Sequence, residues 1–275
     1  MRYLIIFLSF FVYTSASNGA DIVERLGTPI LKGEIAPGDA NKLLSYLRDD
    51  RHSTVPAILR VNSPGGSVEE AIKIGEIVRD LMMTVHLNMD GVCYSACFFI
   101  YMFAHERNSA LGKVGLHRTY FKKQYFSDLS FEKAQSVYQS AREKYGNILI
   151  DLGVPKHLID KMYSQKSSDL YILSERELVD ELGLKSEAFE EWIIASCGEM
   201  GAEENNDLWE LGLGHYNLGD PPPEPLKGYK KYLYEKSSKI KSCRVGKISE
   251  AQEKGVLEHL PNSRAAKLIS LLNPA

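Results

Sequence analysis

The chain has 275 residues, of which 44% are hydrophobic and 25% are charged, and its formal net charge is −3. These values are ordinary for a globular protein, and they exclude a disordered, collagen-like or disulfide-dense chain. The slight acidic excess argues against a dedicated nucleic-acid-binding protein, which normally carries a basic excess. The four cysteines permit one or two disulfides.

Residues 1–16 have the pattern of a secretory signal peptide. Arg2 is the only charge before an apolar run from Tyr3 to Tyr13, and small residues follow the run. Such a run is shorter than the roughly 20 residues that a membrane-spanning helix needs. We therefore expect cleavage near Ala16 and a secreted or periplasmic protein, with an uncleaved N-terminal anchor as the alternative.

Composition divides the remaining chain into three regions. Residues 21–197 alternate short apolar runs with helical patterns and predict one α/β domain. Residues 198–226 are acidic and end in a proline cluster, so we expect a linker there. Residues 227–275 hold 11 Lys and Arg against 4 Glu and predict a small, basic helical appendage, with an amphipathic helix over 265–272.

Strand and helix patterns follow one another through the first of these regions. We expect strands at 28–35, 56–61, 84–87 and 113–117, and helices at 37–48, 67–82, 95–104, 130–152 and 155–163. Ser67 is the expected N-cap of its helix, and Glu70 is expected to complete a capping box. Strands separated by helices predict a mainly parallel sheet that is covered by helices.

Two segments that follow strands carry residues suited to catalysis or anion binding. In the first, residues 62–67 (NSPGGS), adjacent glycines allow backbone N–H groups to approach an anion closely. A tight strand-to-helix turn without a ligand explains the same residues. In the second, residues 91–97 (GVCYSAC), Ser95 lies at the expected start of a helix, where the helix dipole favours negative charge, although it could equally serve only as an N-cap.

A histidine that ends a strand could serve as the partner of this serine. His117 lies in the segment GLHR, at the end of the strand expected over 113–117. A neutral imidazole beside a hydroxyl can take its proton and later return it. A structural or surface role is the alternative for His117, and it is the role we assign to His86 and His105, which lack a surrounding motif.

Taken in order, these segments resemble the Clp protease proteolytic subunit of the ClpP/crotonase superfamily. The resemblance covers about residues 28–185 and includes the NSPGG turn, GVCYSAC, GLHR and the later LYILSERELVDELGL. The signal peptide and the cysteines around Ser95 make the chain most similar to secreted, periplasmic Clp-like proteins. The resemblance implies a ClpP/crotonase-like parallel-sheet spiral with surrounding helices.

The resemblance also implies roles for individual residues. Ser95 would be the nucleophile and His117 the general base, and the backbone N–H groups of Gly66 and Ala96 would form the oxyanion hole. Preorganised donors of this kind contribute about 10²–10³ in rate each. The resemblance implies no metal and no organic cofactor.

The third member of the triad fits less well. Counting back from Ser174 without a gap places Leu170 where the family has an aspartate, and leucine cannot orient an imidazole. Asp169 would serve if one residue were inserted locally, and Ser168 is a weaker substitute. Losing the orienting carboxylate can lower kcat by about 10⁴-fold. The residue that fills this position therefore decides between a full triad and a degenerate site. We predict Asp169.

Two other branches of the superfamily are alternatives. Signal peptide peptidase A shares a similar Gly-Gly turn but uses a lysine base, and Lys113 lies near the expected region. The crotonase enzymes share the two-amide oxyanion hole but lack the Ser/His pair. The GLHR strand fits the Clp pattern better than either.

The expected compartment bears on the pairing of the cysteines and on the partners of the protein. A bridge between Cys93 and Cys97 would stiffen the serine turn if Cys93 precedes the helix, but Cys97 as a small buried hydrophobe is the simpler reading. A bridge between Cys197 and Cys243 would tie the basic appendage to the core. We expect a homo-oligomer acting on a peptide or protein substrate. We expect no nucleic acid and, because the periplasm supplies no ATP, no ATP-driven unfoldase.

The leading hypothesis is a secreted serine-type endopeptidase that works through an acyl-enzyme. The rival is a non-catalytic peptide-binding protein that keeps the fold and has a degenerate triad. An Asp169 carboxylate within hydrogen-bond reach of His117 would favour the enzyme.

Overall fold

The computed structural model describes residues 19–49, 51, 54–110, 112–121, 123–222 and 225–272. The predicted signal peptide, residues 1–16, lies outside this part of the chain. Across the described ranges, no helix is both long and apolar enough to cross a membrane.

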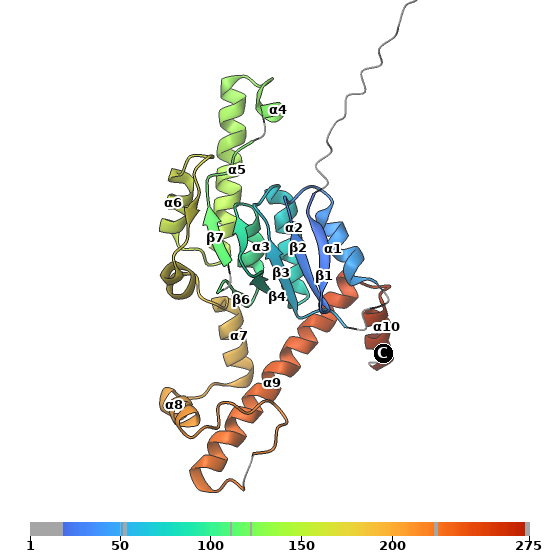
Figure 1. Ribbon diagram of the computed structural model, residues 1–275, viewed down its shortest axis with the longest axis vertical. Helices are drawn as coiled ribbons and strands as arrows, with labels where there is room; N and C mark the ends of the chain where they lie inside the picture. Colours follow the sequence, from blue (N-terminus) through green and yellow to red (C-terminus); the bar gives the residue numbers. More distant parts are fainter. Residues whose placement is uncertain are drawn as a thin grey trace, which may run out of the picture.

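Two sheets form the centre of the molecule (Figure 1). Their strands are β1 (Asp21–Arg25), β2 (Thr28–Lys32), β3 (Ile58–Asn62), β4 (Thr84–Leu87), β5 (Gly91–Tyr94), β6 (Arg107–Asn108), β7 (Gly112–Leu116) and β8 (Tyr171–Ile172). The larger sheet has the order β1-β2-β3-β4-β6 and is parallel except for β1 against β2. The smaller sheet has the order β5-β7-β8, with β5 and β7 parallel and β8 antiparallel. The predicted α/β class with a mainly parallel sheet is confirmed.

Helices surround these sheets and continue into a C-terminal extension. They are α1 (Asp39–Leu47), α2 (Val68–Asp80), α3 (Cys97–Phe103), α4 (Lys123–Phe126), α5 (Phe131–Asp151), α6 (Lys156–Ser164), the π-helical η1 (Glu177–Glu181), α7 (Glu187–Cys197), α8 (Ala202–Glu210), α9 (Gly228–His259) and α10 (Arg264–Leu272). Figure 1 shows α5 standing away from the sheets, with α4 beside its free end. It also shows α9 running from the α8 end of the molecule back to the core.

Local pattern explains why α2 forms where it was predicted. Its apolar residues recur at helical spacing, and Ala71, Ile74 and Val78 are completely buried. Ser67 is the N-cap, and its hydroxyl accepts a hydrogen bond from the Glu70 N–H at 3.3 Å. The buried face of α2 packs against α3.

Only half of the predicted capping box is present, because Glu70 caps a different helix. The Ser67 N–H donates to the Ile35 carbonyl at 2.8 Å and leaves no donor for the Glu70 carboxylate. That carboxylate, which is buried, instead accepts from the N–H groups of Gly38 and Ala40 at 3.0 and 2.9 Å. Glu70 therefore joins α2 to the N-terminus of α1, where a negative charge is favourable.

The C-terminal region is helical, as predicted for residues 227–275, and it packs more extensively than the prediction described. The segment 198–226 contains α8, and Leu208 and Leu213 form a second small core with Leu233 of α9. The disulfide considered between Cys197 and Cys243 is present and joins α7 to α9. The region is thus a packed extension, since α9 contacts α7, α8, α10 and, at its far end, α2.

Candidate functional site

The Gly-Gly turn is fastened to the strand that precedes Ser95. Ser63, which is buried, donates its N–H to the Val92 carbonyl at 2.7 Å and accepts from the Tyr94 N–H at 3.0 Å. Its hydroxyl accepts a hydrogen bond from the Gly65 N–H at 3.1 Å. These bonds connect the end of β3 to β5, and so connect the larger sheet to the smaller one.

Gly66 presents an unused backbone donor beside this connection. The Ile35 N–H donates to the Gly65 carbonyl at 2.7 Å, and the Ser67 N–H donates to the Ile35 carbonyl at 2.8 Å. The pairing with Ile35 therefore uses the neighbours of Gly66, and no acceptor in the described residues takes the Gly66 N–H. Its φ of 140° is one that glycine adopts readily.

Ser95 lies on a sharp turn between β5 and α3. Its φ is 54°, in the left-handed region that residues with a Cβ rarely occupy. Its N–H donates to the Gly115 carbonyl at 2.9 Å, and its carbonyl accepts from the Phe98 N–H at 3.0 Å. The helix predicted over 95–104 begins only at Cys97, with Ala96 as its N-cap, so Ser95 is not a capping residue.

The two turns approach each other closely at Gly65. A Cβ atom built on Gly65 would stand 2.7 Å from the Ser95 Cβ and 3.0 Å from the Ala96 nitrogen. Ala96, like Gly66, has an N–H that no described residue accepts. Two unpaired donors beside a serine on a strained turn are the arrangement that an oxyanion hole requires.

His117 follows β7 directly and is only partly exposed. Its Nδ1 lies 2.9 Å from the Arg118 carbonyl oxygen. Because a carbonyl can only accept, Nδ1 is the donor of this bond, which leaves Nε2 of a neutral imidazole as the nitrogen available to a general base. Within the described chain, no hydrogen bond joins His117 to Ser95.

Asp169 is exposed, and its Oδ1 accepts a hydrogen bond from the Ser168 hydroxyl at 2.9 Å. In the described residues no hydrogen bond joins it to His117. β8 pairs Leu116 with Tyr171, so extending this register by one residue sets His117 opposite Leu170. The Arg118 carbonyl holds the His117 nitrogen that a carboxylate would otherwise hold, and the orienting role of Asp169 remains a prediction.

A cleft of about 560 Å³ opens over the two turns. Gly66 and Ser95 contribute to its lining, whereas His117 and Lys113 do not. The remaining lining residues come from the loop after Gly33, the start of α2, the segment after β7 and α5: Glu34, Ile35, Ala36, Pro37, Ser67, Val68, Glu69, Thr119, Tyr120, Phe121, Tyr125 and Tyr145.

Sequence reasoning missed the aromatic wall of this cleft. Tyr120, Phe121 and Tyr125 come from the segment TYFKKQYF, whose density of aromatic residues was the available signal. Tyr145 of α5 completes the wall and donates its hydroxyl to the Glu69 carboxylate. Burial and this hydrogen bond both raise the pKa of Tyr145, so its hydroxyl stays protonated.

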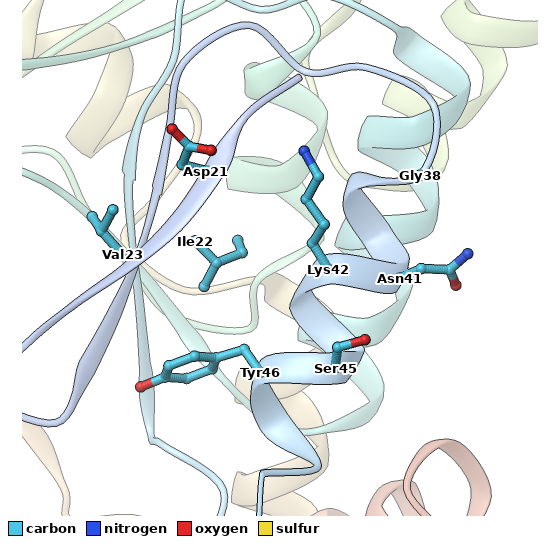
Figure 2. A pocket seen from close by; sticks show the side chains of 8 residues that line it. All are labelled: Asp21, Ile22, Val23, Gly38, Asn41, Lys42, Ser45 and Tyr46. Carbon is cyan, nitrogen blue, oxygen red and sulfur yellow. The ribbon is translucent and has the colours of Figure 1, made fainter. Parts of the chain in front are cut away.

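A second, shallower hollow of about 640 Å³ lies between β1 and α1 (Figure 2). None of the predicted site residues lines it. Its Lys42 donates to the Ala20 carbonyl at 3.0 Å, and its Tyr46 hydroxyl donates to Glu24 at 3.1 Å. These contacts serve to hold β1 against α1, so we place no chemistry there.

Comparison with known proteins identifies a family that is similar to part of the chain. Residues 17–115 match the Clp protease family model, a stretch that includes Gly66, Ser95 and Ala96 and ends two residues before His117. No curated protein is significantly similar to the chain. Among solved structures, ClpP1 from Listeria monocytogenes is 19% identical and a point mutant of it is 20% identical. Each comparison covers 57% of this chain and 88% of the other, with a TM-score of 0.42. The family match and the α/β fold support the predicted ClpP/crotonase-like relationship.

Proposed function

We propose that this chain, with its Clp-protease-like residues 17–115, is a secreted serine peptidase that hydrolyses peptide bonds through an acyl-enzyme. The observation that carries the proposal is the meeting of the Ser95 turn with the unpaired N–H groups of Gly66 and Ala96. The cleft above them is open to solvent and large enough for an extended peptide segment.

The proposed mechanism gives each of these groups one role. The Ser95 Oγ attacks the peptide carbonyl while the His117 Nε2 takes its proton, and the Gly66 and Ala96 N–H groups stabilise the oxyanion. His117 returns the proton to the leaving amine, and water then hydrolyses the ester by the same route. Catalytic hydrogen bonds often tighten only with substrate bound, so we place the Ser95–His117 contact in that complex.

One observation favours a second candidate function. Ser95, His117 and Asp169 share no hydrogen bond within the described residues, as expected if the triad has decayed. The cleft with its aromatic wall would then hold a peptide without cleaving it.

A fluorophosphonate probe distinguishes the two functions, because only an activated serine displaces its fluoride. We expect one adduct on the mature protein, located at Ser95 by mass spectrometry and absent from Ser95→Ala. His117→Ala should slow labelling by about 10²–10⁴-fold, whereas His157→Ala, an exposed histidine paired with Glu181 on η1, should leave the rate unchanged. A folded protein that does not label would overturn the peptidase and favour the peptide-binding protein.

The same samples test the role of Asp169. If its carboxylate orients His117 in the substrate complex, Asp169→Asn should slow labelling by up to about 10⁴-fold. An unchanged rate would leave the Arg118 carbonyl as the orienting group of a dyad.

Secretion, self-association and independence from an ATPase belong to the same proposal. Two disulfides in one chain are typical of an oxidising compartment, which supports export. The exposed α5 offers a surface for a second copy of the chain. Expression of the full chain in a bacterial host should give periplasmic protein that begins near Ser17, measured by intact mass, and light scattering should report an oligomer that labels without nucleotide.

A further inference from the structure

The Cys93–Cys97 disulfide spans the nucleophile turn and nothing else. Cys93 lies in β5, opposite Val114 of β7, and Cys97 is the first residue of α3. Both are completely buried. The loop that the bridge closes contains only Tyr94, Ser95 and Ala96, so the bridge ties the end of the strand to the start of the helix.

Backbone hydrogen bonds also hold this turn, but none of those in the described residues fixes the direction of the Ser95 hydroxyl or of the Ala96 N–H. The Ser95 N–H and carbonyl are hydrogen-bonded, but no described residue bonds to the Ser95 hydroxyl or accepts the Ala96 N–H. A left-handed φ at a residue with a Cβ relaxes unless its surroundings prevent it. Catalysis requires the Ser95 hydroxyl and the Ala96 N–H to keep fixed directions relative to Gly66.

We propose that the Cys93–Cys97 disulfide is a positioning device for the nucleophile and the oxyanion hole, and that its reduction switches the site off. The proposal rests on the peptidase function stated above. Reduction by a dithiol breaks the Sγ–Sγ bond, transfers two electrons and two protons to give two thiols, and leaves the reductant as a cyclic disulfide. The freed turn lets Ser95 return to an ordinary φ and turns the Ala96 N–H away from Gly66.

The second disulfide provides a matched control. Cys197–Cys243 joins α7 to α9 and closes a much longer loop, so it constrains the unfolded chain more than Cys93–Cys97 does. If both bridges were only structural, removing Cys197–Cys243 would lower the stability and the labelling rate more than removing Cys93–Cys97. If Cys93–Cys97 positions the nucleophile, its removal would lower the labelling rate of Ser95 more.

The test compares Cys93→Ala/Cys97→Ala with Cys197→Ala/Cys243→Ala. We expect the first variant to lose about 100-fold in the fluorophosphonate labelling rate of Ser95, because catalytic groups displaced by about 1 Å lose this much. The control should label within about twofold of wild type, although its thermal midpoint falls further. Equal labelling in both variants, or losses that parallel the thermal midpoints, would overturn the proposal.

Two further measurements cover the remaining outcomes. If Cys93→Ala/Cys97→Ala does not fold, a dithiol titration of Cys197→Ala/Cys243→Ala acts on the remaining bridge alone, and the labelling rate must fall on reduction and return on reoxidation.

If the wild type does not label at all, the peptidase function fails, and hydrogen exchange then decides the positioning role separately. The Ser95 amide, bonded to Gly115, should exchange faster in the first variant and not in the control. Equal exchange in the two variants would overturn the positioning role.

Discussion

At the scale of single residues, the backbone of Ser95 is the most informative feature. Among the described residues other than glycine, only Leu26, Met82, Asp90 and Ser95 have a left-handed φ, and only Ser95 lines the cleft. Such a conformation costs about 1–2 kcal/mol. Strain of this kind persists where surrounding structure imposes it, and it is frequent at catalytic sites.

The close approach of Gly65 to this turn yields a prediction about activity. Gly65→Ala places a Cβ 2.6 Å from the Tyr94 carbonyl and 2.7 Å from the Ser95 Cβ, which forces the two turns apart. We expect the labelling rate of Ser95 to fall by about 10²–10³-fold, the loss typical of a displaced oxyanion donor. Gly27→Ala is the control, since Gly27 also has a positive φ but its added Cβ meets no atom within 4 Å. Equal labelling rates in the two variants would refute the proposed closeness of the turns.

A second prediction concerns pH and the buried His105. Burial, and to a smaller extent the nearby charge of Arg244, lower the pKa of His105 to about 4. The unfolded chain, with a histidine pKa near 6.5, therefore binds this proton more readily than the folded protein does between pH 6.5 and 4. The free energy of unfolding falls as the pH decreases through that window, by about 2 kcal/mol between pH 7 and pH 5.

Urea unfolding of wild type and His105→Gln at the two pH values measures this effect. Glutamine does not titrate, so the variant should lose about 2 kcal/mol less than wild type on acidification. An identical pH dependence in the two proteins would show that His105 is not the responsible group.

At the scale of elements, the contact between α9 and α2 depends on one glycine. A Cβ on Gly255 would lie 1.9 Å from the Asp80 carbonyl oxygen at the end of α2, so only glycine allows this approach. Two polar contacts in the same region support this approach. The His259 Nε2 lies 3.0 Å from the Asp80 carboxylate, and the His259 backbone carbonyl accepts a hydrogen bond from the Arg48 guanidinium at 2.8 Å. The predicted strands and helices did not indicate that α9 contacts α2.

Two alanine substitutions on α9 should therefore change stability in opposite directions. Gly246→Ala meets no atom within 4 Å and should stabilise the protein by about 0.5–1 kcal/mol through helix propensity. Gly255→Ala carries the same propensity gain but should destabilise the protein by about 1–3 kcal/mol, because the helices must separate. Chemical denaturation measures both values, and a Gly255→Ala protein as stable as Gly246→Ala would contradict the docking.

At the scale of the whole molecule, the basic C-terminal region is part of the fold. Residues 227–275 carry 11 Lys and Arg, and two of these residues pair with carboxylates outside this region. The structure shows docking: Lys236 bonds to Glu204 at 2.5 Å, and Arg244 bonds to Glu106. Opposite charges that are distant in sequence thus meet across the two parts of the chain.

The sequence by itself determined the elements whose signals are local. Helical spacing and the N-cap Ser67 predicted α2. Ser130 and the long polar pattern after it predicted α5. The alternation of strands and helices predicted the parallel sheet. Periodicity and capping act within a few residues, so they can be recognised without knowing the fold. The same reading missed β5, because a short apolar run does not reveal whether a partner strand exists.

The site depended on contacts that no local pattern encodes. Three of these contacts join segments about 20 to 30 residues apart. They are the close approach of Gly65 to Ser95, the hydrogen bond from Ser95 to Gly115, and the capping of α1 by Glu70. Sequence motifs could nominate Gly66, Ser95, Ala96 and His117 as candidates. Only the tertiary structure decided which backbone N–H groups stay unpaired and that the Arg118 carbonyl accepts a hydrogen bond from the His117 imidazole, since both depend on how strands and turns pack.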